Sequence, residues 1–293
     1  VSTAIGEGAR TASAIAARVK VPERGIRILC NYLTTLGFIT KSGDTYGLTP
    51  DSAFFLTKQS PAYLRGTMRF PHTPALTKNY GRLTETIRNG AVAPEGNTVS
   101  DQNPIWVEFA RAMVPMMVPA AQVIADVLGV ASAGPLRVLD IAAGHGIFGI
   151  TIAQRNPAAE ITAVDWPAVL AVATENATAM GVAARHHTRP GSAFTVDFGS
   201  GYDVALMTNF VHHLDPPTNV PLLKKTAAAL KPGGRIAVLE MVPNEDRVTP
   251  PLAAGFALTM LAGTPAGDAF TLKDLTAMLA GGGFGRVNIH PAP

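Results

Sequence analysis

Residues 136–149, LRVLDIAAGHGIFG, decide the fold, because an apolar strand pattern runs into small residues and then into a helical pattern. This succession predicts a strand, a tight turn and the N-terminus of a helix. Gly144 and Gly146 allow the backbone to turn sharply and to approach a ligand closely. The free N–H groups that open the following helix favour partly anionic groups. The segment therefore predicts a nucleotide-type ligand at this turn.

The glycines alone do not name the ligand. Gly144, Gly146 and Gly149 spell G-x-G-x-x-G, and Asp165 ends a second predicted strand at the distance that a dinucleotide site requires. Asp140, at the mouth of the first strand, favours a different ligand. A carboxylate aimed into the turn repels a pyrophosphate but suits an ammonium group, which S-adenosylmethionine carries on its amino-acid end.

The composition is that of a globular chain. At 293 residues it is long enough for one large domain and a smaller one. It is 47% hydrophobic and 15% charged, but we find no run of about 18 apolar residues free of charges or Pro-Gly interruptions, and so expect no membrane partner. The single Cys30 cannot form an internal disulfide, which favours a reducing, cytoplasmic location.

Two helical patterns and two short strand patterns open the chain. The strand patterns are joined by the turn composition of Lys41–Asp44, and helix, helix, hairpin is the order of a winged helix. Ser60-Pro61 has the form of an N-cap followed by proline, and predicts a further helix up to Phe70. The first four elements are expected at residues 11–18, 22–36, 38–40 and 46–48.

The charge of this region argues for a protein partner rather than a nucleic acid. Residues 1–104 contain 12 Lys and Arg against 7 Asp and Glu, which is a weak electrostatic footprint for DNA. The second predicted helix offers only Arg24 and Arg27 near its start and otherwise an apolar stripe. We predict that residues 1–70, with the long helix described next, form a homodimer surface, and that no nucleic acid binds.

A long apolar helical pattern begins at Pro104 and links the two halves of the chain. Prolines at positions 115 and 119 predict breaks in this helix. Methionines at helical spacing usually fill gaps in a core, but thioethers and aromatic faces also suit a flat apolar substrate. Both interpretations stay open for Trp106, Phe109, Met113 and Met117.

Strands and helices alternate from residue 136 onward, which predicts a parallel, doubly wound α/β sheet. Pro232-Gly233-Gly234 forms the sharp turn before the fifth strand. The expected strands are 136–142, 160–165, 185–190, 203–211, 235–242 and 286–289, and the expected helices are 146–155, 167–180, 218–230 and 270–280.

The glycine turn with its two acids resembles the first motif of the class I methyltransferases. That motif has the form acidic-x-x-x-Gly-x-Gly, and a later acid holds the ribose hydroxyls. Asp140 and Asp165 match both positions. The resemblance implies S-adenosylmethionine as the cofactor, bound through these acids and through Gly144 and Gly146, with S-adenosylhomocysteine as the product.

Further stretches resemble the small-molecule O-methyltransferases with a winged-helix dimerisation domain, of the caffeic acid and antibiotic-tailoring type. Residues 207–215, MTNFVHHLD, are similar to the family's strand ending in His-Asp-Trp, and His212 falls at its catalytic-base position. Glu240 falls at the position of the acid that flanks this histidine. Residues 260–267 are similar to a segment that lines the family's substrate pocket, which implies that role for Met260 and Thr264.

The chain departs from the family pattern at several positions. The family's Asp that reads the adenine amine is Ser192 here, which leaves adenine held largely by packing, with Trp166 as a candidate stacking face. The Asp after the catalytic histidine is His213, and the second flanking acid falls on Ala269. The resemblance also places Phe194 and Asn209 at the cofactor.

The resemblance covers nearly the whole chain and implies three parts. These are a winged-helix dimerisation domain at 1–103, a linking helix at 104–134 and a catalytic domain at 135–293 with a Rossmann-like, doubly wound sheet. Related enzymes have further helices before the winged helix and a further antiparallel strand at the end. We expect neither in this chain.

Neighbouring histidines, His186-His187 and His212-His213, raise the question of a metal. Consecutive residues on a strand point to opposite faces, so we expect neither pair to chelate and predict no metal. The leading hypothesis is methyl transfer from S-adenosylmethionine to a hydroxyl of an apolar, aromatic small molecule, with a histidine base. Methylation at carbon or nitrogen, non-methylating chemistry in the same fold, a nicotinamide-dependent oxidoreductase and a DNA-binding regulator stay open, as does the choice between His212 and His213.

Overall fold

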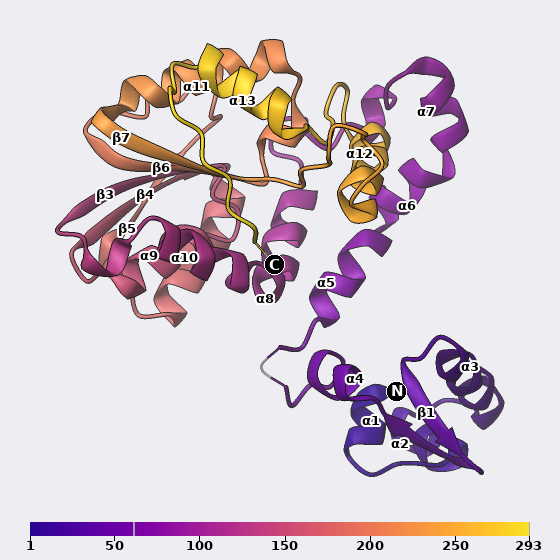
Figure 1. The fold of residues 1–293 in the computed structure, drawn as a ribbon. Coiled ribbons are helices and arrows are strands. Elements are labelled where there is room, and N and C mark those ends of the chain that lie inside the picture. The colour runs from indigo at the N-terminus through magenta and orange to yellow at the C-terminus, as the bar shows by residue number, and fades with distance from the viewer. Residues whose placement is uncertain (61, 293) are drawn as a thin grey trace. The chain divides into compact units, whose positions relative to one another are not determined.

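The computed structural model describes residues 1–60 and 62–292, and the chain divides into two compact units (Figure 1). The first unit is Val1–Met68 and the second is Arg69–Pro293. Each unit has hydrophobic clusters of its own, as expected of separate domains.

The first unit is a small helical domain with one hairpin. Helix α2 begins where the Thr11 hydroxyl accepts the N–H of Ala14 at 3.2 Å. The hairpin is antiparallel, with Ile39 opposite Leu48. The predicted order of helix, helix and hairpin is confirmed, with one more helix on either side. The elements are α1 (Ser2–Gly6), α2 (Ala12–Val19), α3 (Glu23–Thr35), β1 (Ile39–Ser42), β2 (Thr45–Leu48) and α4 (Pro50–Phe55).

Residues 69–103, which we expected with the N-terminal domain, pack in the second unit. The N–H and the hydroxyl of Thr98 both donate to the carbonyl of Gly263 at 2.8 Å, which ties this segment to the end of α12 (Pro251–Gly263). The predicted helix start at Ser60-Pro61 depends on Pro61, which lies outside the described residues. Helix α5 (Arg65–Arg69) precedes this region and ends at its first residue, and the helices within it are α6 (Pro74–Gly81) and α7 (Leu83–Asn89).

Helix α8 (Ile105–Val127) runs unbroken through Pro115 and Pro119, so the predicted breaks are wrong. Each proline removes one N–H bond, but the helix packs along α9 (Ile147–Arg155) and buries Ala121 and Ile124 in the core, which offsets the loss. By length and composition alone α8 could cross a membrane. Its buried face belongs to the core of the second unit.

Within residues 69–292, a five-stranded parallel sheet has the order β5-β4-β3-β6-β7. The central strand β3 pairs with β4 and β6, so Asp140 lies in register with Ala163 and Leu206. The strand order reverses at β3, and ligands of open α/β sheets bind at the carboxyl ends of the strands beside such a reversal. The strands are β3 (Leu136–Ile141), β4 (Ala159–Asp165), β5 (His186–Pro190), β6 (Tyr202–Thr208) and β7 (Leu230–Leu239).

Helices cover both faces of this sheet, as predicted for a doubly wound fold (Figure 1). Helices α8, α9 and α10 (Pro167–Ala179) lie on one face, and α11 (Pro216–Ala229) and α13 (Leu272–Gly281) lie on the other. The sixth strand expected at 286–289 is wrong, because these residues pair with no strand and Val287 packs instead into the apolar cluster beneath α11 and α13.

Candidate active site

The turn after β3 has the backbone that the glycines predicted. Gly144 and Gly146 have φ angles of 56° and 73°, in the left-handed region that favours glycine. At Gly146 there is also little room, because a Cβ atom would lie 3.0 Å from the Cβ of Ala173. Gly146 is the N-cap of α9, so the turn delivers the chain directly into a helix N-terminus.

Asp165 closes this turn from the end of the neighbouring strand β4. One of its carboxylate oxygens accepts the N–H of Gly144 at 2.8 Å, and the other accepts the N–H of Trp166 at 2.7 Å. Burial raises the pKa of Asp165 to about 6, against the effect of these two bonds. Each carboxylate oxygen keeps a further acceptor position, so the group can take two hydroxyl donors from a ligand.

Asp140 lies beneath the turn rather than at its surface. Its side chain is completely buried, and one carboxylate oxygen accepts the N–H of Gly149 at 3.2 Å, while the other has no partner among the described residues. Burial raises the pKa of Asp140 to about 8; the bond from Gly149 opposes this shift and the charge of Asp165 adds to it. At neutral pH the ionised acid of this pair is therefore Asp165.

A cavity that opens to solvent lies over the carboxyl ends of the strands. Its wall brings together the turn after β3, the end of β4, the loop after β5, the segment after β6 and the first turns of α8. The predicted site residues in its lining are Trp106, Phe109, Gly144, Asp165, Trp166, Ser192, Phe194 and Asn209. Gly146 and Asp140 support this wall from behind.

The loop after β5 is held in place by Lys225 of α11. Its ammonium group donates to the carbonyls of Ala193 at 2.8 Å, Phe194 at 3.1 Å and Val196 at 2.6 Å, which uses all three of its donors. The hydroxyl of Ser192 accepts the N–H of Phe194 at 3.3 Å. The ammonium group of Lys225 therefore holds this loop in the conformation that forms one wall of the cavity.

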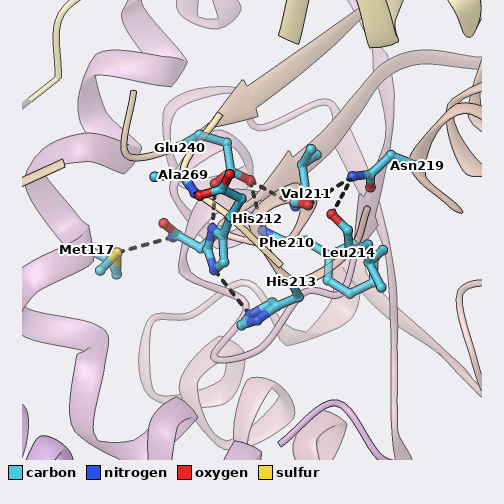
Figure 2. A network of polar contacts seen from close by, with 11 residues as sticks. Met117, Phe210, Val211, His212, His213, Leu214, Asn219, Glu240 and Ala269 are labelled. Carbon is cyan, nitrogen blue, oxygen red and sulfur yellow. Dashed lines mark hydrogen bonds and ion pairs between the residues drawn. The ribbon is translucent and has the colours of Figure 1, made fainter. Parts of the chain in front are cut away.

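Two buried side chains, His212 and Glu240, are joined behind the cavity wall by a contact between the ring Nδ1 of His212 and one oxygen of Glu240 (Figure 2). The other oxygen of Glu240 accepts the N–H groups of Phe210 at 3.2 Å and Val211 at 2.8 Å. The carboxylate is therefore oriented by the backbone of the turn that carries the histidine.

The second ring nitrogen of His212, Nε2, contacts the ring of His213. The two Nε2 atoms are 3.1 Å apart (Figure 2). The ring of His213 also packs in a T-shaped arrangement with Trp106, at 4.9 Å between ring centroids. Burial, followed by the neighbouring His212, lowers the pKa of His213 well below the usual value for histidine. His213 lines the cavity, whereas His212 does not.

The contact between the rings of His212 and His213 contradicts the expectation that the two rings point to opposite faces of a strand. Strand β6 ends at Thr208, before the predicted 211, because Asn209 takes a left-handed φ of 53°. His212 and His213 follow on a single 3-10 turn, Val211–His213, where neighbouring rings can meet. Across residues 1–60 and 62–292, no cluster of three or more His, Cys, Asp or Glu side chains could hold a metal.

Four predicted substrate residues lie outside the lining. Met113 packs against the core, and Met117 is buried with its sulfur 3.5 Å from the side-chain nitrogen of Asn209. Met260 and Thr264 are also buried, and the Thr264 hydroxyl accepts the N–H of Gly267 at 2.9 Å. The following residue, Asp268, donates its N–H to the carbonyl of His212 at 2.9 Å, so this segment supports the histidine from behind.

Sequence reasoning missed several lining residues. His145 stands between the two glycines of the turn, and its ring stacks on Phe109 with 6.3 Å between ring centroids. Burial lowers the pKa of His145 to about 4, so it is a neutral wall residue. The position of His145 between Gly144 and Gly146 could have identified it as a lining residue from the sequence. Asp101 and Leu214 gave no comparable signal, because only the folded chain brings them to the cavity.

The sheet order, the glycine turn after β3 and the acid at the end of β4 together define a class I methyltransferase fold. Comparison with known families agrees: the O-methyltransferase domain family matches residues 109–285. The chain belongs to this family and is an S-adenosylmethionine-dependent methyltransferase. This assignment replaces the nicotinamide-dependent alternative.

Individual relatives with O-methyltransferase names are similar to most of this chain. The chain is 27% identical to 3-hydroxy-5-methyl-1-naphthoate 3-O-methyltransferase of Streptomyces sahachiroi, over 89% of this chain and 76% of the relative. It is 29% identical to mitomycin biosynthesis 6-O-methyltransferase of Streptomyces lavendulae, over 88% and 75%. A solved structure from Nostoc punctiforme, to which O-methyltransferase activity is attributed, is 46% identical and has a TM-score of 0.94, over 99% of this chain and 87% of that one.

Proposed function

We propose that this enzyme transfers the methyl group of S-adenosylmethionine to a phenolic hydroxyl of an apolar small molecule, with His212 as the base that Glu240 orients. The observation that carries the proposal is the buried His212–Glu240 pair directly behind a cavity walled by Trp106 and Phe109. The naphthoate and mitomycin enzymes named above support an aromatic acceptor of natural-product type.

The cofactor would lie along the turn after β3. Asp165 would accept the two ribose hydroxyls, Gly144 would present its backbone to the ligand, and Trp166 and Phe194 would flank the adenine, with Ser192 and Asn209 as polar neighbours. Asp140 and Gly146 would act from beneath, by holding the start of α9. When bound, S-adenosylmethionine supplies a methyl group that the sulfonium already activates.

The protein must then align the acceptor and remove its proton. A phenol with a pKa near 10 is barely ionised at neutral pH, and a positioned base is worth roughly 10²–10⁴-fold in rate. Glu240 fixes the Nδ1–H tautomer of His212 and stabilises the imidazolium that forms. Trp106 and Phe109 would hold the aromatic acceptor, while Met113, Met117, Met260 and Thr264 would shape the site from the second layer.

His212→Asn tests this proposal against a panel of naphthols, hydroxynaphthoates and hydroxyquinones, with product mass and turnover as readouts. We expect a methyl ether from the wild type, and at least a hundredfold lower turnover in the variant with unchanged affinity for S-adenosylhomocysteine. His187→Asn, an exposed histidine paired with Glu160, is the matched control. Turnover within fivefold of the wild type would contradict base catalysis and favour methylation at carbon or nitrogen.

For the first unit we propose a winged-helix dimerisation domain in a cytoplasmic homodimer, with no nucleic-acid or membrane partner. Apolar side chains gather on one side of α3 and its C-cap, where Ile28, Leu29, Tyr32 and the C-cap residue Leu36 are each more than 40% exposed. Such a stripe favours a protein surface as its cover. Light scattering at micromolar concentration should show a dimer, and Leu29→Asp with Tyr32→Asp should yield a monomer; a monomeric wild type would contradict the proposal.

A further inference from the structure

His213 stands between His212 and the cavity. The Nδ1 atom of His212 is taken by Glu240, and its Nε2 atom faces the Nε2 atom of His213 at 3.1 Å. Of the two rings, only that of His213 lines the cavity. An acceptor in the cavity therefore meets His213 first, and cannot reach the free nitrogen of His212 without displacing it.

The relay assigns one arrangement of protons to these contacts. Glu240 is a carboxylate whose first oxygen accepts two backbone N–H groups, and neutral His212 donates its Nδ1–H to the second oxygen. The Nε2 atom of neutral His212 is then an acceptor, and His213 must donate its own Nε2–H. This leaves the Nδ1 atom of His213 without a proton. It is buried and has no partner among the described residues.

We propose that His213 is the group that takes the hydroxyl proton of the acceptor, at its unpartnered Nδ1 atom, and that it passes its Nε2 proton to His212. The inference rests on the proposed O-methyl transfer and replaces a single base with a relay of two rings. Buried polar atoms are normally paired, and the ring of His213 borders the cavity, so a shift of this ring toward the cavity would pair its Nδ1 atom with a donor that arrives with the ligand.

The relay balances atoms and charge. The acceptor O–H bond breaks as its oxygen forms a bond to the methyl carbon, and the carbon–sulfur bond breaks with its electron pair left on sulfur. The proton goes to Nδ1 of His213 while the Nε2 proton of His213 moves to Nε2 of His212. His213 ends as the opposite neutral tautomer, and His212 ends as an imidazolium against Glu240.

The surroundings of the two rings explain why the positive charge should not stay on His213. Its ring packs against the aromatic rings of Trp106 and Phe210, whereas His212 has the carboxylate of Glu240 beside it. Burial disfavours charge on His213, which agrees with its lowered pKa. The positive charge that the sulfonium loses is therefore more stable on His212, beside Glu240, than on His213.

The rate test compares His213→Asn, His212→Asn and the double variant, with His187→Asn as the control, on the panel phenol that the wild type methylates fastest. Each single variant should lose at least a hundredfold in single-turnover rate at unchanged affinity for S-adenosylhomocysteine, and the double variant should be less than tenfold slower than either. If only His212→Asn loses rate, the relay is wrong and the proposed function stands. If neither loses rate, base catalysis itself is wrong.

A second test needs no turnover. Nitrogen-15 NMR of the histidine rings in the complex with S-adenosylhomocysteine should show His213 protonated at Nε2 and His212 at Nδ1, with His213→Asn and His212→Asn to assign the signals. Saturation with 2-naphthol should shift the Nδ1 resonance of His213 and leave that of His187 unchanged. A neutral His213 protonated at Nδ1, or no shift when calorimetry shows bound naphthol, would overturn the relay.

Discussion

Replacement of Asp165 by Asn measures how much of the cofactor affinity depends on one carboxylate. In the wild type both oxygens accept a backbone N–H, from Gly144 and Trp166, and each keeps one further position for a ribose hydroxyl. The amide keeps one oxygen and places its NH₂ against the other N–H. One charge-assisted bond is lost, at about 1.5–3 kcal/mol, and the other weakens because the charge is gone. We expect a total of about 3 kcal/mol, or roughly a hundredfold.

Calorimetric titration with S-adenosylhomocysteine at pH 7.5 is the assay. Asp203→Asn is the matched control, because Asp203 also accepts a backbone N–H, from Arg137 at 2.8 Å, but lies near the amino end of β6, away from the carboxyl ends of the strands. A loss of less than fivefold in Asp165→Asn would refute the ribose assignment. An equal loss in Asp203→Asn would show that the effect comes from the fold.

The affinity for S-adenosylhomocysteine measured in this titration should fall at low pH. Burial raises the pKa of Asp165 to about 6, and its protonated form accepts fewer ribose hydroxyls. Affinity should therefore hold from pH 7.5 to about 6 and fall by up to about tenfold per unit below that. Asp165→Asn should be flat over this range. A wild-type affinity that does not change down to pH 5 would contradict the assignment.

Three further predictions concern the frame around the site. Lys225→Met should weaken S-adenosylhomocysteine binding by roughly tenfold, because three carbonyls of the loop after β5 lose their donor, whereas exposed Lys224→Met should not change calorimetric affinity. Gly149→Ala should lower stability in urea by about 1–3 kcal/mol, since its Cβ would lie 2.6 Å from a neighbouring isoleucine, whereas Gly255→Ala, with open space around it, should be neutral or stabilising. The folded state raises the pKa of Asp140 to about 8, so the folded chain keeps a proton that the unfolded chain releases near pH 3.8. The free energy of unfolding should therefore fall by about 2 kcal/mol from pH 6.5 to 8. Urea melts should show this fall in the wild type, and Asp140→Asn should remove it.

Local patterns predicted the parts of the site that depend on neighbouring residues. The strand, the glycine turn and the helix N-terminus follow one another in sequence, and Asp165 ends the next strand, so spacing was enough to place them together. The pairing of His212 with Glu240 was implied by the resemblance to the O-methyltransferases, and the adjacent parallel strands β6 and β7 bring the two residues together at one edge of the sheet.

Other features depend on choices that the sequence pattern does not show. Asn209 can take an extended or a left-handed backbone, and only the left-handed one brings the His212 and His213 rings together. Pro115 and Pro119 predict breaks by local rules, but tertiary packing keeps α8 continuous. Lys225 reads as an ordinary charged residue of a helix until the loop after β5 is seen folded around its ammonium group.

The position of β3 at the centre of the sheet has a consequence for synthesis of the chain on the ribosome. Strands β4 and β5 can add to one side of β3 in the order in which they emerge, but β6, its other neighbour, follows β3 by about 60 residues. At typical elongation rates this gap lasts about 3–12 s, during which one edge of this central strand has no partner. Slower elongation or overproduction lengthens the exposure of this edge to other nascent chains, so the yield of folded enzyme should depend on expression temperature and on chaperones that shield unpaired strands.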